Sequence, residues 1–457
     1  MTDIKKSSFT ILGAGRSGIA AAKLLKSNGA KVFLSDGMDK SNLKFFDEDV
    51  LKKNGIEFEL GGHSDRIYQS DIFIKSPGIS PDSEVIVKAI KLNKKIYSEV
   101  EAAYWFCKCP VIAITGTNGK TTTTVLTGEI FKNAGYDTKV CGNVGLAFSE
   151  VVSDTDEKSI VILEVSSYQL DNIELFRPRV SVIMNITPDH IDWHGSFENY
   201  LKAKMKIADN QTGEDITVIN YDDKILREST KELKVRKAFF SIRENLIEKD
   251  TEKGSYYNKG KIIYFDKAKN INEEIMESRE INIRGNHNLY NSLAAIISAR
   301  SFGIKKEIIR DTLKNFEGVE HRIEFVREIN GVRYYNDSKA TNIDSLIVAL
   351  ESFDSNIILI LGGREKGNDY SAADKLIKDR VKEIIAVGEA KEKIFDHFNG
   401  SKKVTRVKSF EEAVNKAKDI SQSGDIVLLS PACKSFDMFD SYEHRGKEFK
   451  RLVNLLK

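Results

Sequence analysis

Short apolar runs alternate with amphipathic segments along most of this chain. The run at 9–13 leads into a glycine-rich turn, a segment with helical spacing at 19–30, and a second apolar run at 31–36. Runs of this length are typical of buried strands, and apolar residues every three or four positions are typical of helices. The chain therefore opens with a β-α-β unit. Further strands are predicted at 71–76, at 111–115, from Ile160, from Val180, and in the later segments NIILILGG, EIIAVG and DIVLLSP.

The pattern divides into three units. A second β-α-β start at 111–115 begins a new ligand loop and is hard to accommodate in the first sheet, so we predict a boundary near Ser98. The polar stretch 241–283 resembles a hairpin around Asn258-Lys259-Gly260 and is predicted to be a surface elaboration of the central domain. A hairpin with Asn330-Gly331 at its turn begins the third unit. We predict an α/β protein with an N-terminal Rossmann-like domain (1–98), a central P-loop ATPase-type domain with a parallel sheet (99–317), and a C-terminal Rossmann-like domain (318–457).

Composition agrees with this organisation. The chain has 457 residues, enough for about three domains. Lys+Arg 70 against Asp+Glu 68 gives a net charge of +2, which favours neither a nucleic-acid nor a membrane partner. We find no apolar run long enough to span a membrane, no signal peptide and no Cys-x-x-Cys pair among four cysteines. We therefore expect a cytoplasmic protein, and we interpret the nearby Cys107 and Cys109 as incidental.

The strongest local signal is a glycine loop between a predicted strand and a predicted helix. Its glycines let backbone N–H groups approach phosphates, and the helix N-terminus adds positive potential. The lysine reaches the terminal phosphates and the following threonine hydroxyl ligates Mg²⁺. Ile114 replaces the first glycine of the longer Walker pattern. The loop predicts a nucleoside triphosphate site made of Gly116, Thr117, Asn118, Gly119, Lys120, Thr121 and Thr122.

A second glycine turn, Gly13–Gly18, follows the first strand and opens a helix, and Asp36 ends the next strand. This is the spacing of a dinucleotide fingerprint, and the same geometry holds any diphosphate. Because the chain carries a separate triphosphate loop, we favour a nucleotide-diphosphate substrate over NAD. Ser76-Pro77-Gly78 is predicted at the carboxyl edge of the same sheet, where ligands bind.

Two further residues end neighbouring strands of the predicted central sheet. Glu164 ends one strand, and His190 follows the next. An acid and an imidazole at the carboxyl ends of adjacent strands can complete a Mg²⁺ site with Thr121. Without the phosphate loop, either would be unremarkable.

Seven segments taken together carry a family resemblance: GTNGKTTT, LEVSSYQL, NITPDHIDWHGSFENYLKAKMKI, GNHNLYN, EHRIE, NDSKATN and LGGREKG. In order and spacing, over essentially the whole chain, they resemble the Mur ligases of peptidoglycan synthesis. Within that family, GAGRSG, SPGIS and SPACKSFDMFDSYEHRG look like the members that add D-glutamate to UDP-N-acetylmuramoyl-L-alanine.

The resemblance implies an ATP-dependent amide ligase with these two small-molecule substrates. ATP phosphorylates the substrate carboxylate, and the amine of the amino acid attacks the acyl phosphate. By matching position, Thr121 and Glu164 hold one Mg²⁺ and His190 a second, while Lys204 becomes a carbamate. Lys120, His190, Lys204 and Lys339 are the expected catalytic residues, and we expect a monomer.

The resemblance also implies ligand contacts. For ATP these are Asn288, Asn291, Arg322 and Asp337; for D-glutamate Thr341, Lys366, Ser435 and Tyr442; for the UDP-sugar Arg16, Ser17, Asp36, Gly78 and Asn143. Tyr442 stands where the family pattern has phenylalanine, so the detail of that contact is open.

Other functions remain open at this stage. A sister ligase for another amino acid and a folylpolyglutamate synthetase share the chemistry, but the first-domain and C-terminal motifs argue against both. A nicotinamide-dependent oxidoreductase would use Gly13–Gly18 and Asp36, yet it leaves the lysine loop unexplained. A nucleotide-sensing regulatory protein would require His190, Lys204 and Lys339 to be dispensable.

Overall fold

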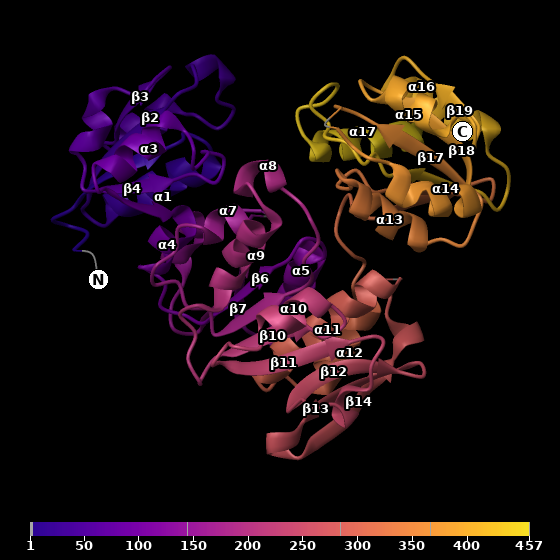
Figure 1. Ribbon diagram of the computed structural model, residues 1–457, viewed down its shortest axis with the longest axis horizontal. Helices are drawn as coiled ribbons and strands as arrows, with labels where there is room; N and C mark the ends of the chain where they lie inside the picture. Colours follow the sequence, from indigo (N-terminus) through magenta and orange to yellow (C-terminus); the bar gives the residue numbers. More distant parts are fainter. Residues whose placement is uncertain (1–2, 144, 284, 366, 457) are drawn as a thin grey trace. The chain divides into compact units, whose positions relative to one another are not determined.

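The computed structural model describes residues 3–143, 145–283, 285–365 and 367–456. Within these ranges the strands form three sheets, each with helices packed against it (Figure 1). The α/β class predicted from the alternating pattern is confirmed. The helices of the described ranges are α1 Arg16–Ser27, α2 Glu48–Lys53, α3 Glu84–Lys91, α4 Glu99–Tyr104, α5 Lys120–Asn133, α6 Phe148–Val151, α7 Ser167–Leu170, α8 Ile191–His194, α9 Phe197–Met205, α10 Lys224–Ser229, α11 Asn286–Ser301, α12 Lys306–Asn315, α13 Ile343–Glu351, α14 Asp374–Arg380, α15 Lys391–Phe398, α16 Phe410–Ile420 and α17 Tyr442–Leu455.

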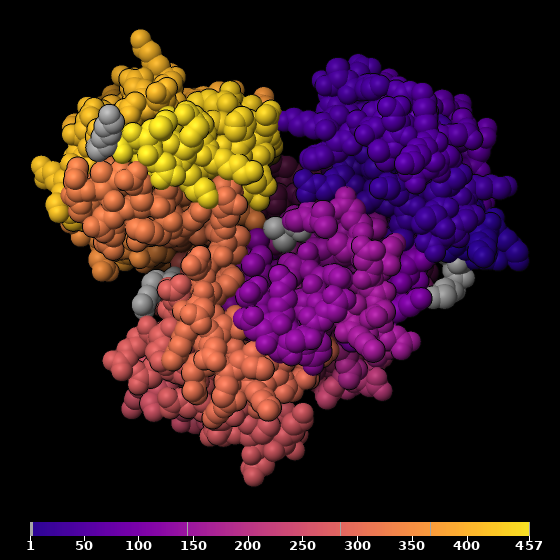
Figure 2. All heavy atoms as spheres, turned by 180° about the vertical axis from the view of Figure 1, so that it is seen from behind, coloured from indigo at the N-terminus to yellow at the C-terminus, as the bar shows by residue number. Residues whose placement is uncertain are grey.

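The first sheet is parallel and has the order β3-β2-β1-β4-β5. Its central strand is fully buried beyond its first residue, because alternate residues pack into cores on opposite faces. Residues of this region form one continuous indigo surface in the space-filling view (Figure 2). The strands are β1 Ser8–Leu12, β2 Lys31–Asp36, β3 Glu57–Leu60, β4 Ile72–Lys75 and β5 Lys95–Ser98.

The central sheet has the order β14-β13-β12-β11-β10-β9-β6-β8-β7. Strand β6 lies between β9 and β8, with all three parallel, so their carboxyl ends meet at one edge. The loops after these strands carry the predicted nucleotide and metal residues, as expected for a parallel sheet. The strands are β6 Val111–Thr115, β7 Asp137–Gly142, β8 Ser159–Glu164, β9 Val180–Ile183, β10 Ile216–Asn220, β11 Arg236–Ser241, β12 Lys253–Asn258, β13 Lys261–Asp266 and β14 Ile271–Glu277.

The polar stretch 241–283 differs from the prediction in one respect. The hairpin turn at Lys259 and Gly260 is present, with φ of 47° and 90°. The stretch is nevertheless part of the central sheet, because β12 pairs in parallel with β11. Strands β13 and β14 then extend the sheet at this edge by antiparallel pairing. Gly254 permits this pairing, since a Cβ there would lie 2.3 Å from the carbonyl oxygen of Phe239.

The third sheet has the order β15-β16-β20-β17-β18-β19. Its opening hairpin turns at Asn330 and Gly331, whose φ values of 51° and 77° fit the two-residue turn predicted from this dipeptide. The remaining pairings are parallel. The strands are β15 Glu324–Ile329, β16 Val332–Asn336, β17 Ile357–Gly362, β18 Val381–Val387, β19 Val404–Arg406 and β20 Ile426–Leu429.

The chain divides into two compact units. One comprises Met1–Asn282 with Asn288–Phe316, and the other Ile283–His287 with Glu317–Lys457. The first two sheets belong to the first unit and the third sheet to the second, while the exact domain boundaries at 98/99 and 317/318 stay predictions. None of the helices in the described ranges combines the length and apolar character needed to cross a membrane.

Candidate active site

The glycine loop 116–119 joins β6 to α5 in a conformation that requires glycine at both ends. Gly116 has a φ of 145°, and a Cβ there would lie 2.9 Å from the Met184 Cβ. Gly119 has a φ of 85° and caps α5, and a Cβ there would lie 2.6 Å from Asn291 Oδ1. The loop is therefore a close backbone turn at a helix N-terminus, which is the arrangement that binds phosphate groups.

Asn185, which follows β9, holds this loop in place. The backbone N–H of Asn118 donates to Asn185 Oδ1 at 2.8 Å, and Asn185 Nδ2 donates to the Asn118 carbonyl at 3.0 Å. The Thr117 N–H donates to the Asn185 carbonyl at 2.9 Å, and Thr117 Oγ1 lies 3.0 Å from the Tyr200 hydroxyl. Neither Asn185 nor Tyr200 was predicted as a site residue, although both belong to the segment NITPDHIDWHGSFENY that carries the resemblance.

Two predicted catalytic lysines converge on one carbonyl oxygen of the loop. Lys120 Nζ donates to the carbonyls of Gly116 and Thr117, each at 2.8 Å. Lys204 Nζ, from α9, also donates to the Gly116 carbonyl at 2.8 Å. Burial lowers the pKa of Lys204 well below its usual range, and the nearby charge of Lys120 lowers it further. The structure thus brings together two lysines 84 positions apart in sequence.

Glu164 ends β8 as a buried carboxylate with one unused oxygen. Its Oε1 accepts a hydrogen bond from Asn143 Nδ2 at 2.8 Å. Its Oε2 is buried and has no hydrogen-bond partner among the residues described. A buried oxygen of this kind is costly unless it is paired, and a hard divalent cation is a suitable partner. Thr121, in the first turn of α5, is also buried, so the donor set fits Mg²⁺.

His190 lies at the start of α8, with its side chain about half exposed. Its φ of 54° places it in the left-handed region, which is uncommon for residues other than glycine. Its Nε2 is 3.5 Å from Asp189 Oδ2, and its ring centroid is 5.1 Å from that of Tyr168 on α7. The imidazole is therefore accessible to a ligand while its ring packs against Tyr168.

The predicted ATP contacts of α11 lie beside the glycine loop. Asn291 Oδ1 accepts from Thr123 Oγ1 of α5 at 3.1 Å, and Asn291 Nδ2 donates to Asn288 Oδ1 at 2.9 Å. Thr122, in the first turn of α5, is buried. The two asparagines are thus linked to each other and to the helix that starts at Lys120.

In the first domain, Asp36 fixes the glycine turn. Its Oδ2 accepts from the Ala14 N–H at 2.6 Å and its Oδ1 from the Met38 N–H at 2.8 Å. Gly18 is required for the turn, because a Cβ there would lie 1.9 Å from the Gly13 carbonyl oxygen. The carboxylate predicted to bind the UDP-sugar is therefore already engaged with backbone N–H groups.

Other predicted sugar-nucleotide contacts surround this turn. Arg16 is exposed and donates to the Gly145 carbonyl at 2.6 Å, so the first-domain turn touches the segment that follows Asn143. The Arg16 guanidinium also lies 4.8 Å from the Phe45 ring centroid. Ser17 is half-buried in the first turn of α1, and Gly78 is exposed after β4.

In the second unit, Asp337 and Arg322 lie near each other. Asp337 is 2% exposed and accepts from Ser430 Oγ at 2.8 Å and from the Ile323 N–H at 3.2 Å. Burial raises the pKa of Asp337 to about 7, although the Arg322 guanidinium favours its charged form. Arg322 Nε is buried and lacks a hydrogen-bond partner among the described residues.

The remaining predicted residues of this unit that the structure describes lie on two loops and at the start of α17. Lys339 Nζ lies 5.4 Å from the Tyr442 ring centroid at the start of α17. Thr341 is half-buried before α13, and Ser435 is buried after β20. Lys366 lies outside the described residues.

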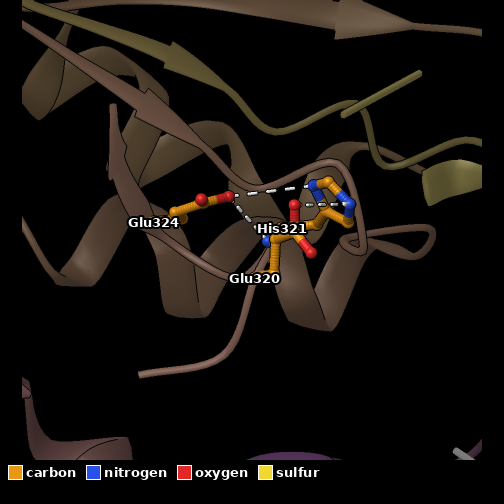
Figure 3. Close-up of side chains that lie close together, drawn as sticks. All are labelled: Glu320, His321 and Glu324. Carbon is orange, nitrogen blue, oxygen red and sulfur yellow. Dashed lines mark hydrogen bonds and ion pairs between the residues drawn. The ribbon is translucent and has the colours of Figure 1, made fainter. Parts of the chain in front are cut away.

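His321, next to Arg322, sits between two carboxylates (Figure 3). Its Nε2 is 3.7 Å from Glu320 Oε1 and its Nδ1 is 3.8 Å from Glu324 Oε2. The Lys450 ammonium already pairs with both carboxylates at 2.7 Å. This cluster therefore carries its own cation and serves to hold the segment that bears Arg322.

The fully buried guanidinium of Arg445 ties α17 to the loop after β16. It donates to Ser338 Oγ at 2.9 Å and to the Ser338 carbonyl at 2.8 Å. It also donates to the Cys433 carbonyl at 3.1 Å. Neither Arg445 nor His321 was predicted as a site residue, although His321 belongs to the resemblance segment EHRIE and Arg445 to SPACKSFDMFDSYEHRG.

The geometry of the first unit defines a class of chemistry. A glycine loop at a helix N-terminus, two lysines, and a buried acid with an unused oxygen can bind a nucleoside triphosphate with a divalent cation. They can also spread the charge that develops on a transferred phosphoryl group.

Three family models match successive parts of the chain. Residues 8–85 match the MurD N-terminal domain, residues 114–299 the Mur ligase middle domain, and residues 321–433 the Mur ligase, glutamate ligase domain. The chain therefore belongs to the Mur ligase family, and the predicted resemblance is confirmed. Mur ligases are ATP-dependent enzymes that use Mg²⁺.

Relatives along the whole chain carry a more specific name. UDP-N-acetylmuramoylalanine–D-glutamate ligases of Salinibacter ruber and Chloroherpeton thalassium are each 42% identical to it. The first match covers 99% of both chains, and the second covers 99% of this chain and 98% of the relative.

Solved structures with this fold include other Mur ligases. The UDP-N-acetylmuramate-alanine ligase MurC of Thermotoga maritima is 20% identical with a TM-score of 0.60, covering 98% of this chain and 99% of that one. MurF ligase of the same organism, in complex with ADP, is 16% identical with a TM-score of 0.58, covering 99% of each chain. These likenesses concern the fold.

Proposed function

We propose that this protein adds D-glutamate to UDP-N-acetylmuramoyl-L-alanine, with conversion of ATP to ADP and phosphate, in peptidoglycan precursor synthesis. The observation that carries the proposal is the convergence of Lys120 and Lys204 on the glycine loop beside the buried Glu164. The full-length similarity to ligases of that name supports the choice of substrates.

The reaction needs activation because a carboxylate is a poor electrophile. Phosphorylation by ATP makes an acyl phosphate, whose leaving group is phosphate, and the D-glutamate amine then attacks the carbonyl carbon. Lys120 and the backbone N–H groups at the start of α5 stabilise the charge on the transferring phosphoryl group. Gly116, Thr117, Asn118, Gly119 and Thr122 shape this phosphate cradle.

The Mg²⁺ ligands follow from the same edge of the sheet. We assign Thr121 and Glu164 to one ion and His190 to a second. The unused oxygen of Glu164 and the accessible imidazole of His190 support this assignment. Bound Mg²⁺ neutralises phosphate charge, and these side chains orient it.

Lys204 is proposed to carry a carbamate. Carbamate formation joins a neutral amine to CO₂ and releases one proton, so it requires the uncharged lysine. Full burial and the neighbouring ammonium of Lys120 both favour that form, and they support the modification. The product is an anionic oxygen ligand suited to Mg²⁺.

Substrate contacts complete the proposal. We assign Lys339 to the transferring phosphate, and Asn288, Asn291, Arg322 and Asp337 to ATP. The side chain of D-glutamate needs a cation, which Lys366 provides, with Thr341, Ser435 and Tyr442 as further contacts. The UDP-sugar is assigned to Arg16, Ser17, Asp36, Gly78 and Asn143. We also propose that the enzyme is a cytoplasmic monomer, since ATP and nucleotide-linked sugars are cytoplasmic substrates.

The test is phosphate release from ATP and Mg²⁺ with UDP-N-acetylmuramoyl-L-alanine, with D-glutamate, L-glutamate, L-alanine or no amino acid offered in parallel. Release that requires D-glutamate is the expected result. Release with another amino acid would keep the ligase chemistry and contradict the substrate, and no release with any of them would contradict both.

A further inference from the structure

Lys75, the last residue of β4, is a buried cation in the strand that leads into the predicted sugar-nucleotide loop. It is 3% exposed, and its Nζ donates to the carbonyl of Ile79 at 3.0 Å, across the loop 76–79. Burial lowers the pKa of Lys75, while the charge of the nearby Asp171 carboxylate opposes this shift. The ammonium also lies over an aromatic ring, 5.5 Å from the centroid of Trp193.

Trp193 belongs to α8, three residues after the proposed Mg²⁺ ligand His190. Its ring is 4.5 Å from that of Tyr168, which in turn is 5.1 Å from the His190 ring. The Trp193 Nε1 is buried and finds no hydrogen-bond partner in the described ranges. Packing and the Lys75 ammonium therefore hold this side chain, and no hydrogen bond of its own does.

The same aromatic cluster reaches the phosphate loop. Tyr168 stacks on His194 with ring centroids 5.6 Å apart and an interplanar angle of 12°. His194 packs on Tyr200 at 5.4 Å, and the Tyr200 hydroxyl lies 3.0 Å from Thr117 Oγ1. A continuous series of contacts thus runs from the loop after β4 to the elements that carry the proposed catalytic groups.

Burying a lysine is costly, and an apolar residue would pack against Trp193 at less cost. A desolvated ammonium on an indole face is, however, a directional contact worth about tenfold or more in an equilibrium. Lys75 contacts the Ile79 carbonyl and the Trp193 ring at once. Movement of the sugar-nucleotide loop therefore displaces the side chain that contacts α8.

We propose that Lys75 is a positioning residue that couples the loop 76–79 to His190 through Trp193 and Tyr168. When the first substrate occupies the loop, Lys75 fixes α8 and so sets the orientation of the imidazole. This inference rests on the proposed function, because it takes the loop as a substrate contact and His190 as a metal ligand.

The sequence offers a direct optical test, because the chain has only two tryptophans, Trp105 and Trp193. In a W105F background, emission comes from Trp193 alone. Titration with UDP-N-acetylmuramoyl-L-alanine, without ATP or Mg²⁺, is expected to change this emission to saturation. With K75M added, we expect substrate binding by calorimetry within threefold of the background and less than a fifth of the emission change. K75R, which keeps the cation, should restore most of it.

Turnover in the same background supplies the second readout. We expect K75M to lower kcat about tenfold, to change the KM for the sugar nucleotide less than threefold, and to raise the Mg²⁺ concentration needed for half-maximal rate. W193L should have the same effect on kcat, and K75M/W193L should be no worse than either single change. If Lys75 had only a structural role, K75M would lower the thermal stability and leave the Mg²⁺ dependence of the rate unchanged.

Three outcomes would overturn the inference: a full emission change in K75M, an unchanged kcat, or additive losses in the double variant. If K75M does not fold, W193L and K75R decide the question, since normal Mg²⁺ dependence in W193L contradicts the coupling. Failure of the wild-type chain to release phosphate would refute the proposed function instead. The emission experiment with K75M would then test only the coupling between Lys75 and Trp193.

Discussion

Asp337 offers the sharpest test of how a proposed catalytic site is built at the expense of stability. Its carboxyl group is fully buried between β16 and the end of β20, with hydrogen bonds from Ser430 Oγ and the Ile323 N–H. Burial raises its pKa to about 7, and the nearby Arg322 does not fully offset this. Replacing it in D337N keeps the shape, since the amide can accept from Ile323 and donate to the serine hydroxyl.

The sign of the effect follows from proton binding. In the unfolded chain the aspartate has its ordinary pKa of 3.8, whereas in the folded chain the pKa is about 7. Between these values the folded state binds more protons, so the free energy of unfolding falls as the pH rises from about 4 to about 7. The full fall is about 4 kcal/mol, at about 1.4 kcal/mol for each pKa unit. An asparagine cannot ionise, so D337N lacks this fall.

The expected result is a difference between D337N and wild type that grows with pH. At pH 4 the two should agree to within about 1 kcal/mol, and at pH 8 the variant should be more stable by up to about 4 kcal/mol. The measurement is hydrogen exchange of peptides from β16 and β20 across a urea series in the full-length chain. D396N, at an exposed aspartate, is the matched control. Parallel pH curves for D337N and wild type would refute the reasoning, and the variant should lose ligase activity.

Three further predictions concern the phosphate loop and the first-domain turn. K120A should lower kcat about hundredfold or more in phosphate-release assays, by loss of charge stabilisation worth ~3 kcal/mol, and near-normal turnover would contradict its role. K204A should be inactive and should be partly rescued by added formate or acetate. K202A, at an exposed lysine of the same helix, should keep wild-type activity with and without these anions. G18A should lower the thermal midpoint because its Cβ would lie 1.9 Å from a carbonyl oxygen, while G15A, whose Cβ meets nothing within 4 Å, should not.

The fold was predictable wherever local pattern decides it. The strand 111–115, the glycine loop and the Asn330-Gly331 turn were assigned correctly because each depends on neighbouring residues. The hairpin in the stretch 241–283 was predicted, but its pairing with the central sheet was not, because that pairing joins β11 and β12 and a polar composition does not reveal it. Whether a segment joins a sheet depends on the strand available beside it, and tertiary structure determines which strand that is.

The candidate site was predictable by residue type and less so by contact. Glu164 and Thr121 stand out because they end a strand and begin a helix. The hydrogen bonds by which Asn185 holds Asn118 join residues 67 positions apart, so sequence spacing does not reveal them. Asp36 shows the opposite case, since the predicted ligand contact is also the group that fixes the Ala14 turn. A carboxylate that accepts hydrogen bonds from two backbone N–H groups shapes a site whether or not it touches the ligand.

The two lysines on the Gly116 carbonyl explain why one of them is suited to modification. Two ammonium groups that share one acceptor in a buried place repel each other. Burial, together with this repulsion, lowers the pKa of Lys204 and favours its uncharged form. Lys120, at the start of α5, is less buried and keeps the position from which a phosphate is reached. The neutral amine of Lys204 is the form that attacks the carbon of CO₂, with loss of one proton, and the proposed carbamate would turn the repulsion into attraction toward Lys120. The geometry that makes the unmodified pair unfavourable therefore favours the proposed carbamate. It predicts that K120M slows the reaction of Lys204 with CO₂, measured by ¹³C NMR of the ¹³CO₂-treated chain.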